Sequence, residues 1–221
     1  MNLPKLLAFL ASPGLHCTRL KDLEDPFEGR YPKHALKTIN SEYARMERKC
    51  GRDPGPNPHF GENTTIWVRE SVYVNCWCCH NHESEALWRI YAHPDGVALT
   101  TTFRRLKEAL PEDHYVGKVR YLDYAEDSPS PDNTFNLAIT KRTNYAHEHE
   151  VRVVRSIAPV HLVFPELPDE TPPFLTTPIS FGVFDTIYTS PFVPAWQHRL
   201  VQDLLRRYGC PIKLERSRMV P

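Results

Sequence analysis

Two glutamates, Glu148 and Glu150, stand one residue apart in the segment KRTNYAHEHEVRVV. Side chains alternate across a β-strand, so positions i and i+2 lie on the same face. If a strand begins at Glu148, both carboxylates point to the same side as Arg152, and the intervening valines point into a core. Two like charges on one face need a cation or a ligand beside them.

The neighbouring residues offer two explanations for this pair. Lys141 and Arg152 supply cations, and charge clusters usually mark the protein surface, so the first explanation is a solvated, salt-bridged strand edge. The second is an active site in which carboxylates stabilise positive charge that develops on a sugar, as in glycoside hydrolysis. The second explanation depends on residues elsewhere in the chain.

A second group of chemically active side chains lies within seven residues of sequence: Cys76, Cys78, Cys79, His80 and His82. Zinc takes four nitrogen or sulfur ligands, and this group offers five. Adjacent residues of a strand point in opposite directions, however, and the sequence has no second Cys-x-x-Cys, so few of the five converge. We therefore predict structural thiols and no metal site, with zinc as the alternative.

Composition and motifs exclude several classes of protein. The 221 residues hold 27 Lys and Arg against 27 Asp and Glu, so no overall charge attracts nucleic acid or an anionic membrane. No glycine-rich phosphate loop is present. No segment is long enough to cross a membrane, and the apolar run near the N-terminus has the spacing of a short amphipathic helix. We expect a cytoplasmic protein with reduced thiols.

The elements that must position these residues mix along the chain without βαβ alternation. This order predicts an α+β fold in which helices flank a curved, mainly antiparallel sheet, within a single domain over residues 1–221. Proline-rich surface loops are expected near residues 52–61 and 165–173. Strands are expected at 66–68, 71–79, 97–103, 115–124, 148–159, 184–189 and 212–215. Helices are expected at 33–49, 81–93, 104–110, 134–145 and 195–208.

Three blocks of sequence resemble a bacterial domain-of-unknown-function family, number 2971. The first is LKDLEDPFEG at residues 20–29, the second runs from Asn75-Cys76-Trp77 to Leu99, and the third covers residues 141–152. Ser190-Pro191 to Trp196 forms a weaker fourth match. The blocks span most of the chain in the family's order. The resemblance implies a bacterial protein, and it carries no settled activity.

Glu148-x-Glu150 at the opening of a valine-rich strand also resembles the E-x-E element of mono-ADP-ribosyltransferases. In those enzymes an Arg or His on an early strand contacts NAD, which corresponds here to Arg19 or His16. They also carry a Ser/Thr strand in the middle of the fold. Thr100 lies in a similar stretch, LTTT, that lacks the Ser-Thr-Ser form.

This second resemblance implies a NAD-consuming enzyme, either an ADP-ribosyltransferase or a NAD glycohydrolase, with a protein or nucleic acid as acceptor. Glu150 is then expected to hold the ribose 2′-OH, and Glu148 to orient the acceptor. Arg19 is expected to pair with the pyrophosphate. Trp88 or Tyr91 is expected to stack on nicotinamide or adenine.

Two other functions remain compatible with the same residues. One is a non-catalytic binding module, related to conflict between bacteria and phages, that uses the charged strand as a partner surface. The other is a nuclease in which Glu148, Glu150 and Asp123 hold magnesium. Against the nuclease, Arg152 stands where the common E-x-K element has lysine.

Overall fold

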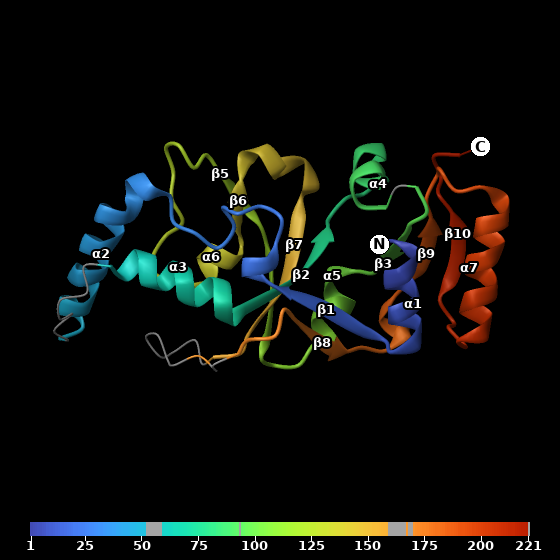
Figure 1. The fold of residues 1–221 in the computed structure, drawn as a ribbon, viewed down its shortest axis with the longest axis horizontal. Helices are drawn as coiled ribbons and strands as arrows, with labels where there is room; N and C mark the ends of the chain where they lie inside the picture. Colours follow the sequence, from blue (N-terminus) through green and yellow to red (C-terminus); the bar gives the residue numbers. More distant parts are fainter. Residues whose placement is uncertain (52–58, 93, 159–166, 168–169, 221) are drawn as a thin grey trace. The chain divides into compact units, whose positions relative to one another are not determined.

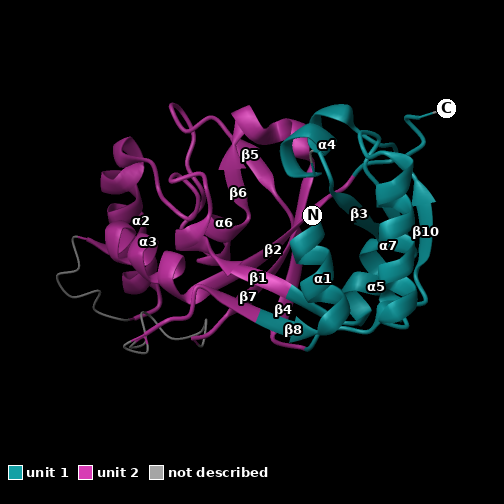
Figure 2. Ribbon diagram, turned by 45° about the vertical axis from the view of Figure 1, so that its right-hand side comes forward, with its two compact units in different colours: residues 1–15, 80–111, 176–221 teal, residues 16–79, 112–175 magenta. Residues whose placement is uncertain are grey.

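A computed structural model of the chain describes residues 1–51, 59–92, 94–158, 167 and 170–220. The chain divides into two compact units, which are described separately (Figure 2). Unit 1 comprises Met1–Leu15, His80–Pro111 and Thr176–Pro221, and unit 2 comprises His16–Cys79 and Glu112–Leu175. The prediction of a single domain stays a prediction.

The largest sheet has five strands in the order β4-β7-β2-β1-β8. Figure 1 labels β1, β2, β7 and β8, and Figure 2 also labels β4. The sheet is open, mainly antiparallel and flanked by helices, which confirms the α+β prediction. Its strands are β1 (Gly14–Arg19), β2 (Val72–Cys78), β4 (His114–Lys118), β7 (Glu150–Ser156) and β8 (Phe174–Pro178).

The core of unit 2 lies on one face of β2 and β7. Val74 of β2 is paired with Val154 of β7, and both are buried with Val68 and Leu137 in one apolar cluster. Because side chains alternate, the same face continues along β7 to Arg152 and Glu150. The helices of this cluster are α2 (Leu36–Lys49), α3 (Phe60–Ser71) and α6 (Phe135–Ala138).

Shorter elements complete unit 2. A parallel pair of strands, β5 and β6, precedes a 3₁₀ helix, η3, that leads into β7. Their bounds are β5 (Arg120–Leu122), β6 (Thr140–Arg142) and η3 (Thr143–Glu148), and the turns η1 (Leu20–Asp22) and η2 (Lys33–Ala35) lie earlier in the chain.

Unit 1 is built on a three-stranded sheet in the order β10-β9-β3. β9 pairs antiparallel with β3 and parallel with β10, and α7 runs beside β10 in both ribbon views (Figures 1 and 2). The strands are β3 (Val97–Thr100), β9 (Thr186–Thr189) and β10 (Lys213–Arg216). The helices are α1 (Leu3–Ala11), α4 (Glu85–Ala92), α5 (Phe103–Glu108), η4 (Phe181–Val183) and α7 (Ala195–Arg207).

Two expected elements are wrong. Residues 66–68 lie in helix α3, where buried side chains recur at helical spacing and the Thr64 and Ser71 hydroxyls each donate to a carbonyl four residues earlier. The helix expected at 134–145 is instead α6, β6 and the start of η3. Of the expected loop at 52–61, the residues from Phe60 onward belong to α3. Residues 52–58 of that loop, and 165, 166, 168 and 169 of the loop expected at 165–173, lie outside the described residues.

None of the helices in the described ranges combines the length and the apolar character needed to span a membrane.

Candidate functional site

The backbone at His149 sets the direction of the two carboxylates. Glu148 is the last residue of η3 and Glu150 is the first of β7, so the expectation of a strand from Glu148 is wrong. The backbone of His149, between them, is in the left-handed region, with φ 45° and ψ 53°. Among the described residues, His149 is the one residue other than glycine that has a positive φ. This sparsely populated conformation turns the chain between the two glutamates.

Both carboxylates meet the ammonium group of Lys141, a buried residue of β6. Its Nζ lies 2.7 Å from Glu148 Oε2 and 3.5 Å from Glu150 Oε2. Glu28 Oε1 is also 3.5 Å from Nζ. Burial lowers the pKa of Lys141, but the hydrogen bond to Glu148 and the charges of Glu28 and Glu150 outweigh it and raise the pKa. Lys141 therefore carries its charge inside the protein.

Arg152 provides the second buried cation and is fully enclosed, with 0% exposure. Its Nε donates to Glu150 Oε1 at 2.7 Å, and its Nη2 donates to Glu150 Oε2 at 3.0 Å and to Glu28. Its Nη1 donates to the Ala138 carbonyl at 2.8 Å. Burial raises the pKa of Glu150, but the adjacent Arg152 outweighs it and holds the pKa below its usual value.

We call these five side chains the buried charge network: Glu28, Lys141, Glu148, Glu150 and Arg152. All five are at most 7% exposed. The sequence named the two cations correctly as partners of the glutamates. The solvated strand edge is wrong, because the network lies in the interior of unit 2, on the face of β7 that also carries the apolar core.

The turn that contains Glu28 is fastened by further charged contacts. Arg142 donates to both carboxylate oxygens of Asp25, at 3.2 and 3.0 Å. The buried guanidinium of Arg69 donates to backbone carbonyls of the turn, those of Lys21, Pro26 and Glu28. These contacts hold the Asp-Pro-Phe-Glu turn rigidly beside the buried charge network.

Two tyrosines lie at the edge of the buried charge network. The Tyr121 hydroxyl accepts a hydrogen bond from the Glu150 backbone N–H at 2.8 Å. The Tyr124 hydroxyl is buried and has no hydrogen-bond partner among the described residues. Burial raises the pKa of Tyr124, and the nearby carboxylates of Glu28 and Asp25 add to this effect. Both tyrosines are therefore neutral at physiological pH.

The structure does not bring Arg19 together with Glu150. Arg19 is paired across the sheet with Tyr73, whereas Glu150 is paired with Cys78, five residues further along β2. At about 3.3 Å per residue, this is about 17 Å along the strand direction. The guanidinium of Arg19 donates to Asp22 at 2.8 Å and to the Thr171 carbonyl at 2.9 Å. Its N–H groups are therefore already hydrogen-bonded to a carboxylate and a backbone carbonyl.

His16, the other early-strand candidate, is exposed on β1 and stacks on Phe174 with ring centroids 4.1 Å apart. The structure thus gives both early-strand residues partners other than the two glutamates, and the strand register places Arg19 far from Glu150.

Trp88, Tyr91 and Thr100 belong to unit 1. Trp88 is buried and its indole N–H donates to Glu83 at 2.9 Å, while Tyr91 is 50% exposed. Thr100 ends β3, and its hydroxyl donates to the Thr186 carbonyl at 3.1 Å. Of the two rings expected to stack on a base, Tyr91 is the one with an exposed surface.

The cysteine-rich segment carries free thiols. Cys76 and Cys78 lie on one face of β2 and Cys79 follows the strand; all three are exposed. The Cys76 thiol is also a hydrogen-bond partner of Glu150. Across the described ranges, no three His, Cys, Asp or Glu side chains are grouped so as to hold a metal ion. Asp123, the third ligand of the nuclease hypothesis, is exposed and accepts from the Ala125 N–H.

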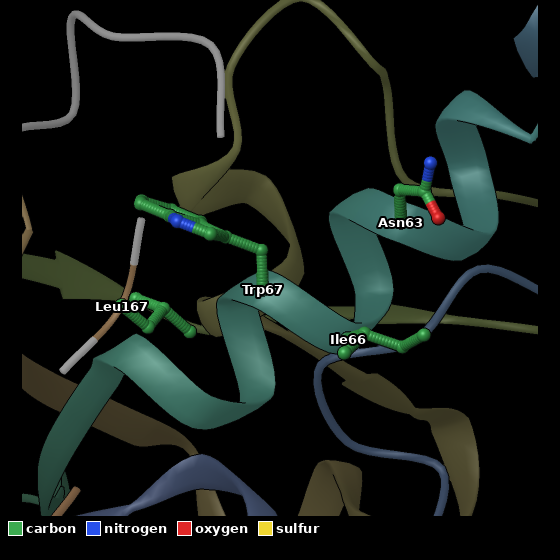
Figure 3. Close-up of a pocket in the computed structure, with 4 residues that line it drawn as sticks. All are labelled: Asn63, Ile66, Trp67 and Leu167. Atoms are coloured by element: carbon green, nitrogen blue, oxygen red, sulfur yellow. The ribbon is translucent and has the colours of Figure 1, made fainter. Parts of the chain in front are cut away.

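A shallow hollow of about 240 Å³ lies elsewhere in unit 2. Asn63, Ile66 and Trp67 project into its lining from α3, and Leu167 completes it (Figure 3). This volume is below the roughly 300 Å³ typical of small-molecule sites. None of the lining residues that the structure describes has a titratable side chain.

Sequence reasoning gave no catalytic or binding role to Asp25, Glu28 or Arg142. The signal that pointed to them was the block resemblance, because the Asp-Pro-Phe-Glu turn and the Glu148–Arg152 segment fall in two of its blocks. The structure joins these two blocks through Glu28–Arg152, Glu28–Lys141 and Asp25–Arg142 ion pairs.

Comparison with known proteins identifies no relative: no protein-family model, curated protein or solved structure matches the chain with significance. The resemblance to family 2971 therefore stays a prediction.

Proposed function

We propose that the chain is a NAD-consuming enzyme of the ADP-ribosyltransferase or NAD glycohydrolase type, within the bacterial family 2971, and that Glu150 is its acting carboxylate. The observation that carries the proposal is the contact geometry of Glu150: Arg152 donates to both of its carboxylate oxygens, and Lys141 links it to a second carboxylate, Glu148. The adjacent Arg152 lowers the pKa of Glu150.

Cleavage of the bond between nicotinamide and ribose builds positive charge on the sugar. A fixed carboxylate stabilises that charge as it develops, provided that the carboxylate needs no reorganisation. The two hydrogen bonds from Arg152 fix the orientation of Glu150 in this way. In the proposed mechanism Glu148 orients the acceptor, which is water, a protein or a nucleic acid, and NAD is the co-substrate.

The test is release of free nicotinamide from NAD by the full chain without added metal. Glu150→Gln keeps the shape of the side chain but removes its charge, and we expect the rate to fall by roughly 10²-fold or more. Glu85→Gln is the matched control, because Glu85 is exposed and paired with Arg89 on α4. Absence of nicotinamide release by the wild type, or equal rates for both variants, contradicts the proposal.

A second candidate is a non-catalytic binding module. It is favoured by the fact that each carboxylate of the buried charge network already has a cation, as expected of a structural network. In this case Glu150→Gln lowers the free energy of unfolding, and neither the wild type nor the variant releases nicotinamide.

A further inference from the structure

Phe27 presents an aromatic ring to solvent at the edge of the Asp-Pro-Phe-Glu turn. The residue is 48% exposed, although its neighbours Asp25 and Glu28 are 5% and 4% exposed. A single exposed apolar side chain is common in proteins. Phe27 differs from that ordinary case because the groups beneath its ring are fixed.

One face of the Phe27 ring is covered by Arg142. The guanidinium carbon lies over the ring, 4.2 Å from its centroid, which is the geometry of a cation–π contact. Arg142 in turn donates to both carboxylate oxygens of Asp25, and the Phe27 N–H donates to Asp25 Oδ1 at 3.0 Å. Ring, guanidinium and carboxylate are therefore joined by direct contacts, while Phe27 as a residue stays 48% exposed.

The stack is continuous with the buried charge network. Tyr145 lies under both cations, with its ring centroid 5.6 Å from the Arg142 guanidinium carbon and 4.5 Å from Lys141 Nζ. Lys141 is the residue that joins Glu148 and Glu150. A planar ring stacked on Phe27 would thus be linked through the contacts of Arg142, Tyr145 and Lys141 to Glu150, the proposed acting carboxylate.

We infer that the exposed surface of the Phe27 ring is a platform on which the planar heteroaromatic ring of a nucleotide stacks. Aromatic side chains bind such rings through their π-faces, and a ring whose position is already fixed loses little conformational entropy on binding. The nicotinamide and the adenine of NAD share this chemistry. The inference rests on the proposed function for the choice of NAD, while the platform itself is a property of the turn.

The experiment measures binding, not turnover. The full chain is titrated calorimetrically with nicotinamide mononucleotide, AMP and ribose 5-phosphate, and the three ligands separate the two ring types from the sugar phosphate alone. We expect at least one ring-bearing ligand to bind more tightly than ribose 5-phosphate. Phe27→Ala should weaken that ligand roughly tenfold or more, whereas Phe27→Trp should retain binding and report it by fluorescence quenching.

Phe103→Ala is the matched control, because Phe103 is 50% exposed and lies on α5 in unit 1. It should leave binding unchanged, and thermal unfolding shows whether each variant is folded. Equal binding by Phe27→Ala and Phe103→Ala, equal binding of ribose 5-phosphate, or no binding at all overturns the inference. If binding depends on Phe27 but no nicotinamide is released, the platform stands and the proposed function is wrong. If nicotinamide is released but binding does not depend on Phe27, the proposed function stands and the platform is wrong.

Discussion

At the scale of single residues, Arg152 is the side chain on which the interior of unit 2 depends most. Its removal leaves Glu28 and Glu150 buried without their closest cation, and an uncompensated buried charge costs about 3–5 kcal/mol. We therefore expect Arg152→Leu to lower the free energy of unfolding by about that amount in urea denaturation. Arg89→Leu, which breaks an exposed pair with Glu85, should change it by no more than about 1 kcal/mol.

The lowered pKa of Glu150 predicts how stability depends on pH. Because the folded-state pKa is below the ordinary value of 4.5, the stabilisation is complete above that value and is lost as the pH falls through the folded-state pKa. For Lys141 the pH dependence of stability has the opposite sign. Because its pKa is raised, its contribution to stability is complete below pH 10.5, so Lys141 adds nothing to the loss of stability in acid.

Urea midpoints measured from about pH 7 to about pH 3 test this expectation. The wild type should lose more stability over this range than Glu150→Gln, which cannot titrate at that position. Parallel curves for the two proteins would show that Glu150 does not titrate differently on folding.

The chemical partners in this region were predictable from the sequence, but their burial was not. Two adjacent like charges require cations, and Lys141 and Arg152 lie in the same short segment of sequence. The third carboxylate, Glu28, lies 124 residues from Arg152, and no local pattern predicts a contact over that separation. Glu28 belongs to the Asp-Pro-Phe-Glu turn, whose two carboxylates, Asp25 and Glu28, are both buried.

At the scale of elements, the junction between η3 and β7 is the segment most sensitive to backbone conformation. His149 adopts positive φ there, which glycine accepts readily and a β-branched residue does not. We expect His149→Val to lower the free energy of unfolding by about 1–2 kcal/mol and His149→Gly to be close to neutral. Thermal or urea unfolding of both variants measures the difference, and equal stability would mean that the left-handed turn imposes no constraint.

Helix α3 shows why element type can be misjudged from a short window. Residues 66–68 read as a strand because isoleucine, tryptophan and valine favour strands. The longer pattern from Phe60 to Ser71 buries residues three and four apart, which is the spacing of a helix packed on a core. Tertiary packing overrides the local preference here, whereas β2 forms where its alternation predicts it and β7 begins at Glu150 instead of Glu148.

At the scale of the whole molecule, the fold class followed from the irregular order of helices and strands, but the grouping of residues into units did not. The residues expected to bind NAD are divided between the two units: Arg19 and His16 lie in unit 2, and Trp88, Tyr91 and Thr100 in unit 1. Sequence order alone gave no warning of this division, because unit 1 is assembled from three separate stretches of the chain.

The long separations within the buried charge network also bear on how the protein folds. Arg152 reaches Glu28 across 124 residues, and Arg142 reaches Asp25 across 117. Closing such loops is entropically costly, and the charges gain little until water has left the surrounding core, so we expect these bonds to form after the rate-limiting barrier. Arg152→Leu should therefore accelerate unfolding in stopped-flow experiments while leaving the refolding rate nearly unchanged. The charged side chains buried in unit 2 would then govern how long the native state lasts more than how quickly it is reached.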